Sequence, residues 1–110
     1  MSNEEKRYRY CPICATPLKK QSINGENRKA CGKNSCNYIE WNNPIPVLAA
    51  IVQAGDNVVL VRALGWPEDW FGLVTGFHES GETAEDGVVR EVKEELGLNC
   101  QVESLVGVYT

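Results

Sequence analysis

The stretch from Gly76 to Leu98 constrains this chain more than any other, because it reads as a glycine-rich loop followed by a helix, GFHESGETAEDGVVREVKEELGL. Thr83 is expected to cap the amino end of the helix, and Gly97 is expected to end it. An advance of about 100° per residue gathers apolar side chains into one stripe, formed by Val89, Val92 and Leu96. We therefore expect this helix to pack on a sheet.

A second face of the same helix is acidic, with carboxylates at Glu91, Glu94 and Glu95. Neighbouring carboxylates repel each other unless a cation neutralises them, and ligands that offer only oxygen favour Mg²⁺ or Mn²⁺ over zinc. Arg90 precedes Glu94 by one turn and can orient it through an ion pair. Gly87 lies on the same side, where its missing side chain would let the preceding loop come close. The alternative is an ordinary solvated acidic face.

Two cysteine pairs mark the amino-terminal part of the chain. Cys11 and Cys14 are followed, after sixteen intervening residues, by Cys31 and Cys36, and the segment between the pairs contains the hairpin signal Asn24-Gly25. This spacing predicts a zinc ribbon over residues 1–43 with four cysteine ligands. A pair of disulfides, or unpaired cysteines in a small core, is the less favoured reading in a chain without a secretory signal. The second pair is more widely spaced than usual, and Ala15 and Asn37 stand where many ribbons have glycine. We expect the metal to be needed for folding.

The 23-residue stretch resembles a complete Nudix box, and the order of a zinc ribbon, an Asn-Pro-x-Pro link and this box is similar to the NADH-pyrophosphatase-type branch of that superfamily. The matching positions are Gly76, Glu82, Arg90-Glu91-Val92, Glu94-Glu95 and Gly97-Leu98. The resemblance implies an α/β fold, an α/β/α sandwich with a mixed sheet. Residues 44–110 would be its amino-terminal portion, and the remaining strands and closing helix would follow Thr110.

The resemblance also implies roles for individual residues. The Mg²⁺ or Mn²⁺ ligands would be Glu82, Glu91, Glu94, Glu95 and a backbone carbonyl at Gly76 or Thr75. Glu94 or Glu91 would take the proton from the attacking water, and Arg90 would orient the carboxylates. Phe77 would face the ring of the substrate, the alternative being that it packs under the loop. His78 is expected to be a packing or surface residue.

The remaining elements are read from hydrophobic patterns. The prolines of residues 41–46 predict a linker, and the apolar run 47–53 predicts a buried strand. A turn at 54–57 should lead to a second strand over 58–62, and alternation over 99–109 predicts a further strand. No apolar stretch is long enough to span a membrane and no signal peptide is evident, so we expect a cytoplasmic protein.

Charge divides the chain unevenly and bears on its partners. Residues 1–46 hold eight Lys and Arg against four Asp and Glu, whereas residues 47–110 hold three against eleven. An acidic half would repel phosphates unless it bound a divalent cation. We expect a Mg²⁺-dependent pyrophosphohydrolase acting on a nucleoside diphosphate linked to another group, such as NADH, ADP-ribose or FAD. The alternatives are an RNA-end processing hydrolase whose basic ribbon holds RNA, and a non-catalytic nucleotide sensor. For the ribbon, a structural or homodimer-forming role is favoured over nucleic-acid binding.

Overall fold

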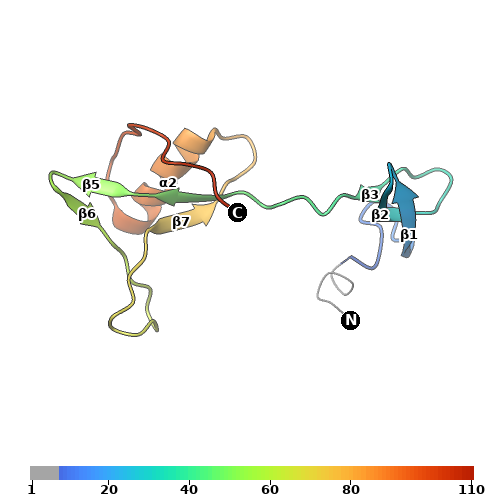
Figure 1. Ribbon diagram of the computed structural model, residues 1–110, viewed down its shortest axis with the longest axis horizontal. Helices are drawn as coiled ribbons and strands as arrows, with labels where there is room; N and C mark the ends of the chain where they lie inside the picture. Colours follow the sequence, from blue (N-terminus) through green and yellow to red (C-terminus); the bar gives the residue numbers. More distant parts are fainter. Residues whose placement is uncertain (1–7) are drawn as a thin grey trace. The chain divides into compact units, whose positions relative to one another are not determined.

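A computed structural model describes residues 8–110 of the chain. The chain divides into two compact units, Met1–Pro44 and Ile45–Thr110. Residues 41–46, which join them, have no regular secondary structure, as the prolines at 44 and 46 predict. Figure 1 labels the strands of both units and the helix of the second unit.

The first unit contains a small antiparallel sheet in the order β1-β2-β3. Its strands are β1 (Leu18–Ile23), β2 (Glu26–Cys31) and β3 (Ile39–Glu40). The predicted hairpin turn between β1 and β2 is confirmed, with positive φ angles of 52° at Asn24 and 84° at Gly25. Among the described residues of this unit, the buried ones are Cys11, Ala30 and Cys31. Two of these three residues are cysteines of the predicted metal site.

The second unit is built from two strand pairs and one helix. Strand β4 (Val47–Ala50) runs antiparallel to β7 (Val74–Phe77), and β5 (Val52–Ala54) runs antiparallel to β6 (Asn57–Val59). Helix α2 (Ala84–Leu96) packs against β7 and β4. Val92 of the predicted apolar stripe and Val74 of β7 are each only 1% exposed. This contact is where the helix and the sheet bury their apolar faces.

Both predicted ends of α2 are confirmed. The Thr83 side chain accepts a hydrogen bond from the backbone N–H of Asp86 at 3.1 Å, which satisfies one of the donors left free in the first turn. At the other end Gly97 has a left-handed backbone with φ of 70°, and its N–H bonds to the carbonyl of Lys93. Local sequence therefore fixes where this helix begins and ends.

Three strand predictions were wrong or only partly right. The run 47–53 is not one buried strand, because it divides at the exposed Ile51, where the chain changes its pairing partner from β7 to β6. The return strand spans 57–59 rather than 58–62, although Val61 still bridges to Gly72. Residues 99–109 form no strand, because no strand in the described part of the chain pairs with them. Among residues 8–110 no helix is long and apolar enough to cross a membrane.

Candidate active site and metal centres

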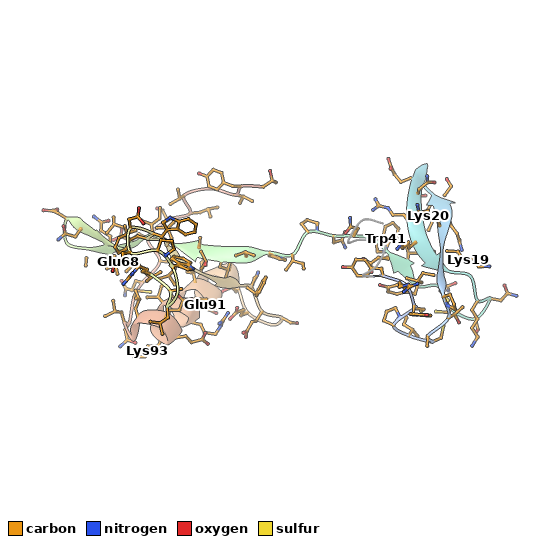
Figure 2. The ribbon with its side chains drawn as sticks, turned by 90° about the horizontal axis from the view of Figure 1, so that it is seen from below. Lys19, Lys20, Trp41, Glu68, Glu91 and Lys93 are labelled. Carbon is orange, nitrogen blue, oxygen red and sulfur yellow. The ribbon has the colours of Figure 1, made fainter. Side chains whose placement is uncertain are left out.

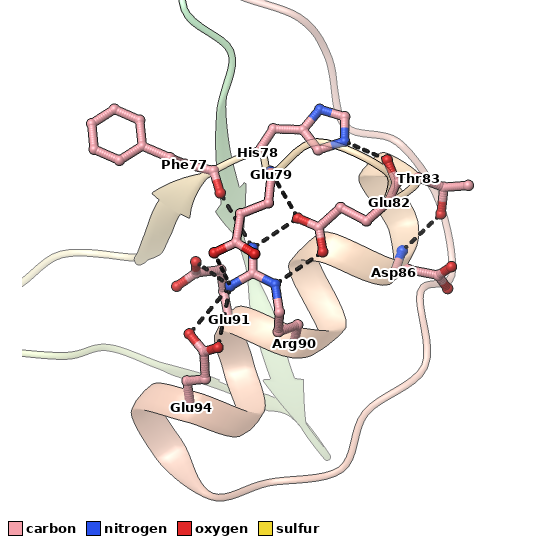
Figure 3. A network of polar contacts seen from close by, with 9 residues as sticks. All are labelled: Phe77, His78, Glu79, Glu82, Thr83, Asp86, Arg90, Glu91 and Glu94. Carbon is pink, nitrogen blue, oxygen red and sulfur yellow. Dashed lines mark hydrogen bonds and ion pairs between the residues drawn. The ribbon is translucent and has the colours of Figure 1, made fainter.

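The loop before α2 and the exposed side of that helix bring several carboxylates around one guanidinium group, that of Arg90 (Figure 3). The strongest contact is bidentate: Nε donates to Oε2 of Glu82 at 2.9 Å, and Nη2 donates to Oε1 of the same carboxylate at 2.8 Å. The planar fork of arginine matches a carboxylate in this geometry, and such charge-assisted pairs are stronger than neutral hydrogen bonds. Glu82 is thereby tied to the helix eight residues further along the chain.

The remaining donors of Arg90 reach the helix carboxylates and the strand. Nη1 donates to Glu91 at 2.8 Å and to Glu94 at 3.2 Å, which confirms the predicted ion pair one turn apart. Nη2 also donates to the backbone carbonyl of Phe77 at 3.2 Å, and Glu79 lies 3.6 Å from Nη1. One cation therefore links the end of β7, the loop and two turns of α2.

This network changes the ionisation of its members. Hydrogen bonds from Arg90, with a smaller contribution from the backbone N–H of Glu79, lower the pKa of Glu82 to about 2. The pKa of Arg90 is raised further above its usual value by its bonds to Glu82 and Glu91. Glu82 is therefore ionised throughout the physiological range. Four carboxylates face a single guanidinium, so the site keeps an excess of negative charge.

Two glycines allow this close packing. A Cβ atom at Gly76 would overlap the carboxylate of Glu91, so the end of β7 can approach α2 only if this residue lacks a side chain. A Cβ at Gly87 would lie 2.6 Å from Cδ1 of Leu48 and 2.7 Å from Oε1 of Glu82. The predicted approach of the loop to Gly87 is confirmed, and β4 approaches it as well.

The loop itself is closed by two residues that sequence reasoning did not assign to the site. His78 donates from Nε2 to the backbone carbonyl of Glu82 at 2.8 Å, and the backbone N–H of Glu79 donates to Oε1 of Glu82 at 2.9 Å. Together they fold the four residues before Glu82 into a tight loop. His78 is the single histidine of the chain, and its position inside the 23-residue stretch is the one feature of the sequence that could have indicated a role in closing this loop.

The predicted site residues differ in how far they are exposed to a ligand. Glu91 is 12% exposed and Glu94 is 57% exposed, so Glu94 is the more accessible of the two to a ligand. Glu95 is exposed, and no side chain or backbone group among the described residues forms a hydrogen bond or ion pair with its carboxylate. Phe77 is 64% exposed, and its ring points away from Arg90 (Figure 3).

The donor set at this site suits a hard divalent cation. It consists only of oxygen, carries excess negative charge and includes two accessible carboxylates, those of Glu94 and Glu95. The carboxylates are nonetheless spread around the guanidinium rather than gathered at one point. Among residues 8–110 only the four cysteines bring three or more metal-ligating atoms within 4.8 Å of one another.

The four predicted cysteines come together in the first unit. Sγ of Cys11 lies 3.6 Å from that of Cys36, and Sγ of Cys14 lies 3.5 Å from that of Cys31. Zinc–sulfur bonds of about 2.3 Å in a tetrahedron place sulfur atoms about 3.8 Å apart, so the cluster fits zinc closely. Hydrogen bonds with the hydroxyl and backbone of Thr16 lower the pKa of Cys14 to about 6, whereas burial and the neighbouring cysteines, acting against a backbone bond from Tyr38, raise the pKa of Cys36 to about 11.

Comparison with known proteins gives a family model that matches the second unit and individual relatives whose similarity extends into the first unit. The NUDIX domain family model matches residues 43–110. The NAD-capped RNA hydrolase NudC of Pseudomonas fluorescens is 28% identical over 93% of this chain and 36% of its own length, a match that extends through most of the cysteine-bearing unit. The human NAD-capped RNA hydrolase NUDT12 is 32% identical over 84% of this chain and 21% of its own length.

Two further comparisons give one relative found by its sequence and one solved structure with a similar fold. The ADP-ribose pyrophosphatase of Methanocaldococcus jannaschii is 41% identical over 66% of this chain and 44% of its own length. The crystal structure of a NUDIX hydrolase from Nitrosomonas europaea superposes with a TM-score of 0.66 at 27% identity, covering 79% of this chain and half of the other. The predicted α/β fold class is thereby confirmed. The chain spans between about a fifth and a half of the length of these proteins.

Proposed function

The chain belongs to the NUDIX domain family, and from that premise we propose that it hydrolyses the diphosphate of a nucleoside diphosphate joined to another group. Water would attack one phosphorus atom, and the products would be two phosphate esters. The observation that carries the proposal is the Arg90 network, in which Glu82, Glu91 and Glu94 are held together while Gly76 lies against Glu91. Phosphoryl transfer depends mainly on charged groups that are held in fixed positions, and this network holds three carboxylates in fixed positions.

We assign each residue of the network a separate role. Arg90 fixes Glu82 and Glu91 and so keeps the glycine-rich loop against the helix. Glu91, Glu94 and Glu95, assisted by Glu82 and the backbone carbonyl at Gly76, would hold Mg²⁺ or Mn²⁺. The bound cation would neutralise charge on the phosphoryl oxygens and make a water more acidic. Glu94 is the more exposed of the two candidate bases, and we assign it the proton of the attacking water.

For the substrate we propose an adenosine dinucleotide or ADP-ribose. NAD and ADP-ribose, which appear in the names of the similar proteins, both contain a diphosphate attached to adenosine. Phe77 supports this choice, because its exposed ring leaves the strand at the residue directly after Gly76. An aromatic face in that position can stack on a base or a nicotinamide ring.

The test is hydrolysis of ADP-ribose and NADH by the full chain, with Mg²⁺ added below saturation. Glu94→Gln and Glu95→Gln are nearly isosteric but remove a negative oxygen, and each should lower kcat/KM by about a hundredfold or more, since a catalytic metal contributes several kcal/mol. Glu85→Gln is the matched control, because Glu85 is exposed in the first turn of α2, away from the network. Near wild-type activity of either test variant would refute the assignment.

A second candidate function is the processing of RNA ends that carry a dinucleotide. It is favoured by the excess of basic residues in the first unit and by the match to a NAD-capped RNA hydrolase across both units. Binding of such a substrate should weaken strongly with salt, because phosphate contacts release counterions. Salt-independent affinity for capped RNA would exclude this candidate while leaving the small-molecule reaction intact.

A further inference from the structure

The carboxylate of Glu79 lies beside Arg90 but accepts no hydrogen bond from any described residue. The backbone of Glu79 is fixed, because its N–H donates to Oε1 of Glu82 at 2.9 Å, and the preceding His78 donates its N–H to the carbonyl of Pro46 at 3.2 Å. The Glu79 side chain is 65% exposed, and its Oε1 lies 3.6 Å from Nη1 of Arg90, which is beyond hydrogen-bond distance. This carboxylate is therefore held close to the guanidinium without being bonded to it.

The hydrogen bonds of Arg90 leave no donor for a further carboxylate. A guanidinium has five N–H donors, one on Nε and two on each Nη atom. The Nε donor and one Nη2 donor bond to Glu82, and the second Nη2 donor bonds to the carbonyl of Phe77. The two Nη1 donors bond to Glu91 and Glu94. All five donors are therefore in use.

The bond to Glu94 is the weakest of those that Arg90 makes to a carboxylate. Nη1 lies 3.3 Å and 3.2 Å from the two oxygens of Glu94, whereas charge-assisted bonds of this kind are usually about 2.7–2.9 Å long. The Glu94 side chain is also 57% exposed, against 16% for Glu82 and 12% for Glu91. Glu94 is therefore the carboxylate that can leave the guanidinium at the lowest cost in free energy.

No other described cation of the second unit can take part in such an exchange. Of the three basic residues in this unit, Arg90 alone forms ion pairs with described residues, whereas Arg62 and Lys93 form none. Lys93 donates to the carbonyl of Gly97 at 3.4 Å. It follows Glu91 by two residues and so lies about 200° around the helix from it, and Figure 2 labels both. Any exchange of carboxylate partners therefore takes place at Arg90.

We propose that Glu79 replaces Glu94 on Nη1 of Arg90 when Glu94 turns to a divalent cation. The distance from Glu79 has to shorten by about 0.7 Å to reach that of a charge-assisted bond. The guanidinium then keeps all of its hydrogen bonds, and Glu82 and Glu91 stay in position. Glu79 is a positioning residue, since it acts through Arg90. The inference rests on the proposed function, because it requires a cation at Glu94.

The experiment is a double-mutant cycle on Mn²⁺ binding. Electron paramagnetic resonance of free Mn²⁺ gives the dissociation constant for the zinc-loaded full chain without substrate. Glu79→Gln should weaken Mn²⁺ binding by about two- to fivefold, which is the size of an exposed ion pair. In the Glu94→Gln background the same change should have little effect, because no side chain then leaves Arg90 for the cation. Such non-additivity is the mark of two residues that act on one group.

Two measurements separate this role from a general effect of charge or folding. Glu85→Gln removes the same charge from the exposed first turn of α2, and it should change Mn²⁺ affinity by one and the same factor in both backgrounds. Glu79→Gln keeps the backbone N–H that bonds to Glu82, so hydrogen exchange at residue 79 and the melting temperature should match those of the wild type.

A crystal structure of the full chain with Mn²⁺ tests the exchange directly. It should show a carboxylate oxygen of Glu79 about 2.9 Å from Nη1 of Arg90, and Glu94 withdrawn from that atom. The inference is overturned if Glu94 remains on Arg90 with Mn²⁺ bound, if Glu79 points to solvent, or if the losses of Mn²⁺ affinity in the cycle are additive.

The outcomes distinguish this inference from the proposed function. A wild-type chain that binds no Mn²⁺ would refute both. Mn²⁺ binding with additive losses would refute only the role of Glu79. Mn²⁺ binding with the expected coupling, but without hydrolysis of ADP-ribose or NADH, would refute the proposed function and leave the partner exchange at Arg90 in place.

Discussion

The two units of this chain are held together by different means. In the first unit the most buried positions include two of the four clustered cysteines, Cys11 and Cys31, so the interior is largely the metal site itself. In the second unit Val74 and Val92 are buried between strand and helix, and Arg90 ties the loop to that helix. We propose that the first unit depends on a bound zinc ion, whereas the second unit depends on contacts between its own side chains.

The difference shows how a small unit can fold without a large apolar core. Domains of this size bury too little surface for the hydrophobic effect alone, and they need a metal, a disulfide or a partner. The second unit instead uses a capped helix and a charge network that is also the candidate site. A change in the network should therefore affect activity and loop order together, whereas a change in the cysteines should affect only the first unit.

Removal of zinc should have the largest effect. Structural zinc contributes about 10–16 kcal/mol in small metal-dependent domains, so the stripped first unit should unfold while α2 persists. Hydrogen exchange measures this directly: amides of β1 and β2 should lose protection, and those of α2 should keep it. Elemental analysis should find about one zinc per chain; Cys14→Ser should lose it, whereas Cys100→Ser, which changes the cysteine outside the cluster, should retain it. Protected β1 and β2 amides without zinc would refute metal-dependent folding.

The next largest effect is expected at the contact between β7 and α2. Gly76→Ala would place a Cβ on the Glu91 carboxylate and displace it, and a displacement of about 1 Å can cost about a hundredfold in rate. Gly72→Ala is the control, because its Cβ would meet ring atoms of Trp66 at an ordinary 3.5 Å. Unchanged hydrolysis of ADP-ribose by Gly76→Ala would mean that the position of Glu91 does not limit the reaction.

The features that the sequence predicts correctly in both units are local. The Thr83 cap, the Gly97 stop and the Asn24-Gly25 turn each depend on interactions within a few residues, so residue type alone indicates them. The Arg90–Glu94 pair follows from the geometry of a single helical turn.

The features that escape prediction depend on segments distant in sequence. The break at Ile51 follows from a change of partner strand, and the apolar residues near Val106 form no strand because the described chain places none beside them. Arg90 holds Glu82 most tightly rather than Glu94, because loop closure by His78 brings Glu82 back to the helix. No periodicity in the sequence reports that closure.

A tenfold effect is expected from Phe77→Leu. Because the ring is exposed and makes no buried packing contact, its loss should lower kcat/KM for ring-bearing dinucleotides by about tenfold, with little change in melting temperature. Phe71→Leu is the control, since Phe71 is similarly exposed but lies in the loop between β6 and β7 rather than in β7. A fall in melting temperature together with equal losses on all substrates would indicate a packing role instead.

The smallest effect should come from the backbone around the cysteines. Ala15 has a left-handed backbone with φ of 64°, whereas Asn37, which follows the second pair, is not among the described residues with positive φ. A side chain in the left-handed region costs about 1–2 kcal/mol, so Ala15→Gly should raise zinc affinity by about fivefold, and Asn37→Gly should give no gain because it only frees the unfolded chain. Competition with a chelator of known affinity measures both. If Ala15→Gly and Asn37→Gly changed zinc affinity equally, backbone strain at Ala15 would not limit the stability of the first unit. The difference in stability between the two units would then depend on the cysteine ligands and not on the backbone around them.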